Sequence, residues 1–318
     1  MNTKGTYKPG ANAVAQNGWL AANKWLIARR LAQFGFIGLF LIGPISLWVL
    51  NLQDQPTKGI WIVKGTLASS ITLDFLPLTD PFIALQTFVA GHILESTALT
   101  GVAIVVAAYA LLGGRTYCSW VCPINVVTDT AHWLRQKLGL EGGAKHSRKS
   151  RYWIMTAALA ASAVTGSVAW ELINPITILS RGILFGAGFA WFIVLAVFLY
   201  DLFAARRGWC SHLCPVGAFY SLIGHVALLR VSAVKRADCN NCMDCFAVCP
   251  EAHVISPVLR GAETGTGPLI LSPNCTNCGR CIDVCAPDVF KFTTRFNNTT
   301  TERSETSCNT PQAPREAA

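Results

Sequence analysis

The chain has 318 residues, of which 52% are hydrophobic and only 14% are charged. Soluble globular proteins average about 25% charged residues, so this composition argues against a soluble domain and favours a membrane protein. The 13 cysteines do not indicate a disulfide-rich secreted protein, because that class consists of short chains whose cores are too small.

Four long intervals without a charged residue predict membrane-spanning helices. A spanning helix needs roughly 20 mostly apolar residues, and each interval is about that long. They run from Arg30 to Asp54, from Glu95 to Arg115, from Arg151 to Glu171 and from Arg181 to Asp201. The segment from Pro81 to Leu94 is also uncharged but short. We interpret it as re-entrant or interfacial, with a fifth span as the alternative.

Lysine and arginine are distributed unevenly between the connecting segments. Five precede the first interval, seven lie within residues 113–151 and eleven follow Asp201, whereas the opposite loops hold only Lys58, Lys64 and Arg181. Because cytoplasmic loops are rich in these residues, both termini are expected in the cytoplasm. This topology accounts for the net charge of +9. The sequence has no basic patch with interleaved aromatic residues, the pattern that would predict nucleic-acid binding.

Two parts of the membrane region repeat one pattern. The sequence DPFI (80–83) precedes the second interval and NPIT (174–177) precedes the fourth, while TYCSWVCPIN (116–125) and GWCSHLCPVG (208–217) follow them. Both copies run in the same direction across the predicted membrane, so a parallel repeat with a pseudo-twofold axis along the membrane normal is expected. Its two cysteine pairs, Cys118 with Cys122 and Cys210 with Cys214, should face each other at the cytoplasmic surface.

The CxxxCP pairs are compatible with several chemistries. A spacing of four places two thiols on one helix face, but the following proline disfavours helix at the second cysteine. We therefore expect a helix end or a turn at the membrane surface with both sulfurs exposed. The four thiols could hold a further iron–sulfur cluster or another soft metal, act as a redox dithiol, or be buried structural cysteines.

Two matching cysteine runs, CNNCMDCFAVCP (239–250) and CTNCGRCIDVC (275–285), form the most specific motif. This is the spacing of bacterial two-cluster ferredoxins, in which three cysteines of one run and the fourth of the other hold each 4Fe-4S cluster. The predicted ligands are Cys239, Cys242, Cys245 and Cys285 for one cluster, and Cys275, Cys278, Cys281 and Cys249 for the other. Zinc does not call for eight cysteines in two matching runs. In the second run the proline arrives one residue late, at Pro287.

The remaining polar residues offer fewer signals. Ionisable groups at membrane depth are functional candidates, so Asp80, His92 and Glu95 are weak candidates for quinone binding, with marking of the membrane interface as the alternative. Only His92 lies near a span and no C-x-x-C-H motif occurs, so no haem site is expected. No glycine-rich nucleotide fingerprint follows a strand. Cys308 lies in a polar tail that we expect to be disordered.

These motifs together resemble the NapH/MauN family of membrane ferredoxin-type proteins over about residues 25–295, with the NapH branch most similar. The resemblance implies quinol oxidation at the bacterial inner membrane, with electrons leaving through iron–sulfur clusters. It also implies a NapG-like peripheral ferredoxin-like subunit and a periplasmic reductase chain, that of nitrate reductase, as partners. Two alternatives stay open: a MauN-like factor that supplies electrons for maturation or reactivation of a periplasmic metalloenzyme, and a non-enzymatic redox sensor.

The expected fold is an α-helical membrane protein with four transmembrane helices in a duplicated two-helix arrangement, followed by a small cytoplasmic α+β two-cluster ferredoxin domain. The expected boundaries are an N-terminal cytoplasmic segment at 1–30, the membrane domain at 31–230, the ferredoxin-like domain at 231–296 and a tail at 297–318. Membrane lipid and the quinone pool are the expected surroundings.

Overall fold

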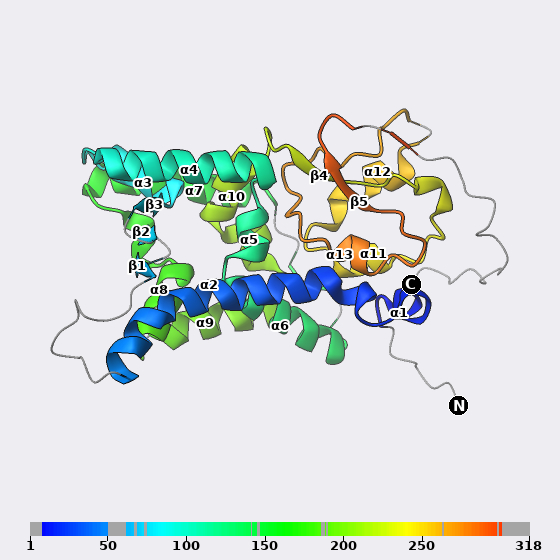
Figure 1. Cartoon of the computed structure of the whole chain (residues 1–318), viewed down its shortest axis with the longest axis horizontal. Helices are drawn as coiled ribbons and strands as arrows, with labels where there is room; N and C mark the ends of the chain where they lie inside the picture. The colour runs from blue at the N-terminus through cyan, green and yellow to red at the C-terminus, as the bar shows by residue number, and fades with distance from the viewer. Residues whose placement is uncertain are drawn as a thin grey trace. The chain divides into compact units, whose positions relative to one another are not determined.

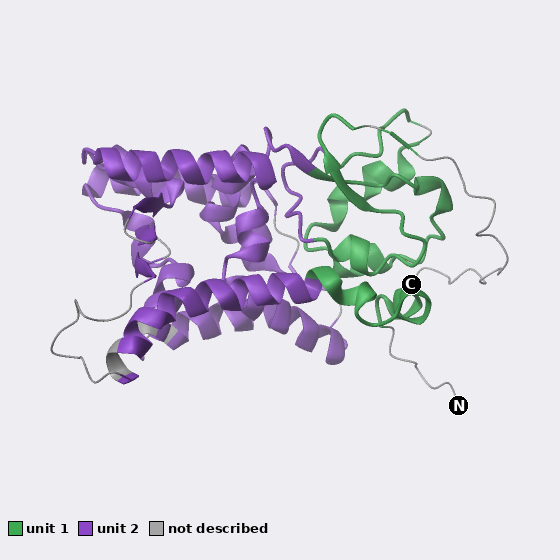
Figure 2. Ribbon diagram, viewed as in Figure 1, with its two compact units in different colours: residues 1–25, 230–270, 279–318 green, residues 26–229, 271–278 purple. Residues whose placement is uncertain are grey.

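The computed structural model describes residues 8–49, 62–66, 69–72, 75–140, 142–144, 147–185, 188, 190–262, 264–297 and 299–300. The chain divides into two compact units (Figure 2). Unit 1 comprises residues 1–25, 230–270 and 279–318, and unit 2 comprises residues 26–229 and 271–278. Cys308, and with it most of the predicted tail, lies outside the described residues.

Residues 1–25 group with most of the ferredoxin sequence in unit 1. The backbone N–H of Gly10 donates to Asp244 Oδ2 over 3.0 Å, and that of Trp25 donates to Asp283 Oδ1 over 3.0 Å. The Trp25 ring also packs edge-on against Phe292, with ring centroids 4.8 Å apart. Two aspartates therefore anchor the two ends of this segment.

Unit 1 contains a two-stranded sheet and short helices (Figure 1). Its elements are α1 (Ala11–Asn17), β4 (Leu229–Ser232), α11 (Asp244–Val248), α12 (Ser256–Arg260), α13 (Arg280–Asp283) and β5 (Lys291–Thr294), with β4 paired to β5. Val231, Ile255, Val289 and Phe290 are among its fully buried side chains. This small mixed fold agrees with the expected α+β character of the ferredoxin-like part.

Unit 2 is mainly helical. Its helices are α2 (Lys24–Val49, whose first two residues group with unit 1), α3 (Pro81–Val89), α4 (Ser96–Leu112), α5 (Thr116–Trp120), α6 (Ile124–Lys137), α7 (Ser150–Thr165), α8 (Pro175–Phe185), α9 (Ala190–Leu199) and α10 (Pro215–Ile223). Among the described residues one helix, Ala21–Ser46, is long and apolar enough to cross a membrane, with a mean hydropathy of 1.5. Ser96–Leu112 and Trp191–Ala204 are apolar but shorter. The four-span arrangement therefore stays a prediction.

The fourth uncharged interval is not one continuous helix, contrary to expectation. Helix α8 ends at Phe185, α9 begins at Ala190, and the two helices contact each other. The sequence between them includes Gly186 and Gly188, and glycine weakens a helix interior by roughly 1 kcal/mol relative to alanine. An apolar interval is thus long enough to span a membrane without being a single helix.

The two sequence repeats adopt the same order of elements. Asp80 caps α3 by accepting the Phe82 N–H at 2.8 Å, and Asn174 caps α8 by accepting the Ile176 N–H at 3.2 Å. An apolar helix follows in each copy, α4 or α9, and then a cysteine-bearing turn and a further helix, α6 or α10. The short segment after Asp80 is thus a nine-residue helix.

A small antiparallel sheet precedes α3 and has no counterpart in the sequence-based expectations. Strands β1 (Val63–Gly65), β2 (Ser69–Thr72) and β3 (Leu76–Thr79) pair in that order, and β3 packs against α4. A Cβ at Gly101 of α4 would lie 3.0 Å from Thr79 Oγ1. The strands are only three or four residues long, too short for a clear alternating pattern.

Gly114 lies close to the backbone of α10. A Cβ added there would lie 2.1 Å from the carbonyl oxygen of Tyr220 and 2.3 Å from Gly224 N, both backbone atoms at the end of α10.

We expect Gly114→Ala to lower the stability of the chain by about 1–3 kcal/mol, because neither backbone atom can rotate away. Unfolding in mild detergent measures this. Gly38→Ala on α2, where no atom lies within 4 Å, is the control and should leave stability equal or higher; an equal loss in both variants would contradict the assignment.

Candidate iron–sulfur and redox sites

Four cysteines from both ferredoxin runs line one pocket of unit 1. Cys239, Cys242 and Cys245 come from the first run, and Cys285, from the second, joins them. The rest of the pocket wall is mostly apolar and includes Met243, Phe246, Leu259, Val289 and Phe290. The structure therefore brings together the four thiols predicted for the first cluster, in surroundings that limit access of water.

The backbone of the two cysteine runs bends at equivalent positions. Asn241 and Met243 in the first run, and Asn277 and Gly279 in the second, have positive φ angles of 55°, 64°, 47° and 72°. Alternation of right- and left-handed conformations directs successive N–H groups into a concave surface that binds anions, including iron–sulfur centres. A backbone shaped in this way at both runs fits a cluster whose thiolate ligands give it negative charge.

The thiols of this pocket disfavour ionisation in one another. Burial first, and then the neighbouring thiols Cys285, Cys239 and Cys242, raise the pKa of Cys245 to about 12. Burial, followed by Cys239 and Cys242, raises the pKa of Cys285 to about 12 against the opposing hydrogen bond from the Val289 N–H. Thiolates at these positions therefore require a cationic centre between them.

The spacing of eight cysteines in two matching runs fits polynuclear clusters. Across the described part of the chain, no three His, Cys, Asp or Glu side chains come together as the ligands of one metal ion would. In a cubane each thiolate binds a different iron, so the four sulfurs lie farther apart than around one ion. None of the twelve described cysteines is in a disulfide.

The cysteines predicted for the second cluster are divided between the units. Cys249 and Cys281 group with unit 1, and Cys275 and Cys278 lie on the segment 271–278 of unit 2. Their joint ligation of a cluster stays a prediction.

Segment 271–278 is hydrogen-bonded to the first CxxxCP copy. Within unit 2, Arg115 Nη1 donates to the Asn274 carbonyl over 3.1 Å, Ser119 Oγ donates to the Thr276 carbonyl over 2.8 Å, and Trp120 Nε1 donates to the Asn277 carbonyl over 3.1 Å. Asn277 in turn donates to the Leu112 carbonyl over 3.1 Å. Two predicted cluster ligands thus lie on a loop held by the cysteine-bearing turn of the membrane region.

The two CxxxCP motifs form the same type of turn. The N–H of Cys122 donates to the Tyr117 carbonyl over 3.0 Å, and that of Cys214 donates to the Trp209 carbonyl over 2.9 Å. Each bond connects residues five apart and turns the second cysteine inward. Cys122 and Cys214 are 7% and 8% exposed, and Cys118 and Cys210 are half-buried. The expectation of exposed sulfurs was therefore wrong, because the turns pack these thiols into the core of unit 2.

Thiols of the two copies lie within electrostatic reach of each other. Burial, then Cys118 and Cys214, raises the pKa of Cys122, and burial followed by Cys118 raises that of Cys214 to about 12. For Cys210, burial, Asp201 and the other three thiols all raise the pKa. The structure thus gathers the four cysteines into one region, as the repeat predicted.

A cluster of tyrosines adjoins these thiols and was not identified from the sequence. Tyr117 and Tyr220 stack with centroids 4.7 Å apart, and Tyr109 packs edge-on against both, at 6.0 and 5.1 Å. Tyr117 and Tyr220 share the hydrophobic core with Cys122 and Cys214. Single aromatic residues in an apolar sequence carry no signal that would distinguish them from ordinary core residues.

The three candidate quinone residues do not form one site. Asp80 is half-buried and lies within electrostatic reach of Tyr109, Tyr117 and Tyr220. His92 and Glu95 are exposed; the His92 ring lies 3.0 Å from the Gly166 carbonyl, and Glu95 accepts from the Thr97 hydroxyl over 3.4 Å. Of the three, only Asp80 lies within electrostatic reach of the tyrosine cluster.

Asp129 on α6 forms ion pairs with three arginines, a feature that motif analysis also missed. Its carboxylate lies 3.2 Å from Arg29, 2.6 Å from Arg30 and 3.2 Å from Arg207. Arg207 and Arg115 are 92 residues apart, the spacing of the paired cysteines. Extending the repeat one residue upstream would have identified both arginines, but not their partners.

Arg115 and Arg207 each bind the opposite copy. Arg115 Nη2 donates to the Cys210 carbonyl over 3.0 Å, and Arg207 pairs with Asp129 on the helix that follows Cys122. Arg115 is 1% exposed. These two guanidinium groups hold the two copies together at the level of the cysteines.

Comparisons with known proteins agree with these motifs. A family described as "4Fe-4S binding domain" matches residues 97–141 and 185–233, and a "4Fe-4S dicluster domain" matches residues 231–287. The methylamine utilization ferredoxin-type protein MauN of Methylorubrum extorquens is 49% identical over 285 residues, covering 90% of this chain and 94% of that protein.

Two ferredoxin-type proteins named NapH are similarly close. That of Haemophilus influenzae is 46% identical over 281 residues, covering 88% of this chain and 93% of its own, and that of Escherichia coli K12 is 43% identical over 290 residues, covering 91% and 96%. No solved structure matches the chain.

Replacement of one pocket cysteine should remove one cluster. We expect Cys285→Ser to lower the iron content of the anaerobically purified chain by about four irons per chain, because loss of one of its four thiolate ligands destabilises the cubane. Iron and sulfide analysis with electron paramagnetic resonance measures this. Cys308→Ser is the matched control and should retain all iron; equal iron in both variants would remove Cys285 from the ligand set.

Asp129 should make the fold sensitive to acid. Burial raises its pKa, but Arg207, Arg29 and Arg30 outweigh burial and hold the pKa of Asp129 below its usual range. The ionised carboxylate therefore stabilises the fold above its ordinary pKa of about 3.9, and this contribution is lost as the pH falls through the lowered pKa.

Asp129→Asn should consequently lower the free energy of unfolding by about 3–5 kcal/mol at neutral pH. The variant should also lose less stability than wild type when the pH falls below about 4. Unfolding in detergent as a function of pH tests both effects. Glu95→Gln, which changes an exposed carboxylate, should keep the wild-type profile. Parallel pH profiles for wild type and Asp129→Asn would contradict this role.

Proposed function

Since the chain belongs to the NapH/MauN family of ferredoxin-type proteins, we propose that it is a membrane electron-transfer protein that oxidises quinol and passes electrons towards a periplasmic reductase. One observation supports the proposed iron–sulfur chemistry most directly. Cys239, Cys242, Cys245 and Cys285 line one shared pocket, and the backbone turns there suit an anion. Clusters held there supply one-electron transfer.

The proposed topology has four spans, with both termini and the ferredoxin unit in the cytoplasm. The long apolar helix Ala21–Ser46 and the apolar helices Ser96–Leu112 and Trp191–Ala204 support membrane insertion. The asymmetric placement of Lys and Arg supports the orientation. Unit 2 then spans the bilayer and presents the CxxxCP turns at its cytoplasmic side.

A further centre at the CxxxCP cysteines is part of the proposal. The family match to a 4Fe-4S binding domain covers both copies of the motif, and the four thiols gather in one apolar core. Cys118, Cys122, Cys210 and Cys214 would be its ligands. The low accessibility of these sulfurs argues against free exchange with soluble thiols.

The contacts of segment 271–278 suggest a route for electrons inside the chain. Arg115, Ser119 and Trp120 of the first CxxxCP copy hold the loop that carries Cys275 and Cys278. Three direct hydrogen bonds join this loop to the first CxxxCP copy. We therefore propose that electrons pass between the CxxxCP region and the second ferredoxin cluster through this loop.

Quinol oxidation also releases two protons, which polar groups at the site must accept. Asp80 is the one quinone candidate within electrostatic reach of the tyrosine cluster. We propose that its carboxylate accepts a proton from the quinol. The proposed partners are a NapG-like peripheral ferredoxin-like subunit and a periplasmic reductase, that of nitrate in the NapH branch.

A second candidate function follows from the relatives named MauN, which are methylamine utilization proteins. In this alternative the chain supplies electrons for maturation or reactivation of a periplasmic metalloenzyme. Deletion of the gene distinguishes the two functions. Our proposal predicts an assembled reductase that is starved of electrons, whereas the maturation function predicts a misassembled, inactive enzyme.

The CxxxCP cysteines should be required for electron flow. We expect Cys118→Ser combined with Cys210→Ser to reduce quinol-dependent reduction of the ferredoxin clusters by at least about tenfold, since removal of two ligands empties the proposed centre. Stopped-flow spectroscopy of purified membranes measures the rate, with Cys308→Ser as control. Unchanged electron flow with intact ferredoxin clusters would favour a redox sensor in which these thiols are structural.

A further inference from the structure

The arginine cluster around Asp129 carries more positive charge than the described side chains neutralise. One carboxylate faces three guanidinium groups, Arg29, Arg30 and Arg207. Asp201 also attracts Arg207, but it attracts Arg135 as well. Four arginines against two aspartates leave an excess of two positive charges.

The three arginines differ in what they can still bind. Arg29 is 4% exposed and is occupied by the Ser119 carbonyl at 3.1 Å and Asn125 Oδ1 at 2.6 Å, besides Asp129. Arg30 is 25% exposed and Arg207 13% exposed, so both reach the surface. The buried Nε of Arg207 has no hydrogen-bond partner in the described structure.

Arg207 also has a strained backbone. Its φ angle of 51° lies in the left-handed region, which non-glycine residues adopt at a cost and mostly at functional positions. The residue follows the end of the second apolar helix and precedes the second CxxxCP turn. Strain combined with uncompensated charge indicates that Arg207 is held in place to bind an anion.

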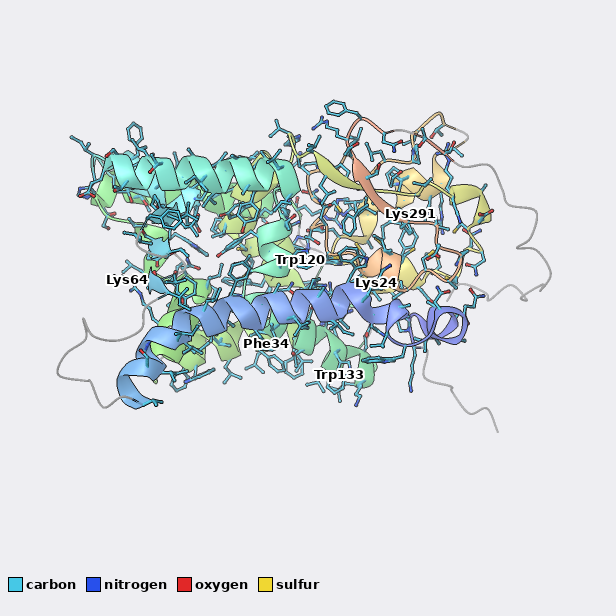
Figure 3. All side chains as sticks on the ribbon, in the orientation of Figure 1. Lys24, Phe34, Lys64, Trp120, Trp133 and Lys291 are labelled. Atoms are coloured by element: carbon cyan, nitrogen blue, oxygen red, sulfur yellow. The ribbon has the colours of Figure 1, made fainter. Side chains whose placement is uncertain are left out.

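The surface next to the cluster is apolar and aromatic. Phe34 follows Arg30 by one helical turn on α2, and Trp133 follows Asp129 by one turn on α6, so each side chain neighbours the cluster. They are 58% and 53% exposed, and in Figure 3 both lie on the same side of unit 2. One turn further, Lys137 Nζ lies 4.2 Å from the Trp133 ring centroid. Aromatic and basic side chains in this arrangement are typical of a membrane–water interface.

From this combination we propose that Arg30 and Arg207 bind the phosphate of an anionic phospholipid. Its acyl chains lie against Phe34 and the neighbouring apolar surface, and Asp129 positions the two guanidinium groups. A lipid fits better than a soluble anion, because exposed aromatic side chains one turn from the charges require an apolar cover. The inference rests on the proposed membrane location and is independent of quinol oxidation.

Native mass spectrometry of the full-length protein in neutral detergent tests the site. With phosphatidylglycerol and phosphatidylcholine added in equal amounts, wild type should retain phosphatidylglycerol preferentially. Arg207→Gln should weaken this binding roughly tenfold, the effect of losing one charge-assisted contact, and Arg30→Gln, nearer the surface, serves if Arg207→Gln does not fold. Lys291→Gln removes one exposed charge from unit 1 and should bind as wild type does.

Three results would overturn the proposal. Equal retention of both lipids, or unchanged phosphatidylglycerol binding in both arginine variants, would show that no such site exists. Thermal stabilisation by inorganic phosphate alone, lost in Arg207→Gln, would identify a soluble-anion site instead. Recovery of the protein from carbonate-washed membranes checks the location separately, so that failure of the membrane assignment is distinguished from failure of the lipid site.

Discussion

The side chain of Arg115 connects three cysteine-bearing parts of unit 2. It begins in the first CxxxCP copy, donates to the backbone of Cys210 in the second copy, and donates to the backbone of Asn274 in the loop that carries two ferredoxin cysteines. The guanidinium group is almost fully buried, so its charge is compensated by these carbonyls rather than by water. A planar group with several fixed donors can make such contacts at once, whereas lysine cannot.

The duplicated CxxxCP motif and residues 271–278 of the ferredoxin sequence belong to one compact unit. The copies exchange contacts through Arg115 and Arg207, so the four CxxxCP thiols are gathered only when both copies are folded. Hydrogen bonds from Ser119 and Trp120, in addition to Arg115, stabilise the conformation of loop 271–278. The conformation of the segment that carries Cys275 and Cys278 is thereby coupled to the folding of unit 2.

The sequence was sufficient for features that depend on local spacing. The two ferredoxin runs and the paired DPFI/NPIT and CxxxCP motifs can be read directly from the sequence, and the structure gives both copies the same order of elements. Features that depend on packing between distant segments could not be predicted in this way. The inward rotation of Cys122 and Cys214, the contact between α8 and α9, and the pairing of Asp129 with arginines on two other segments belong to this class.

The most direct test of the account is cluster reduction by quinol in the purified, anaerobic protein. Addition of one quinol per chain, followed by rapid freezing and electron paramagnetic resonance, should produce the signals of reduced 4Fe-4S clusters, with two electrons recovered for each quinol consumed. Clusters that stay oxidised with quinol but become reduced with a soluble cytoplasmic donor would contradict the proposed direction of electron transfer.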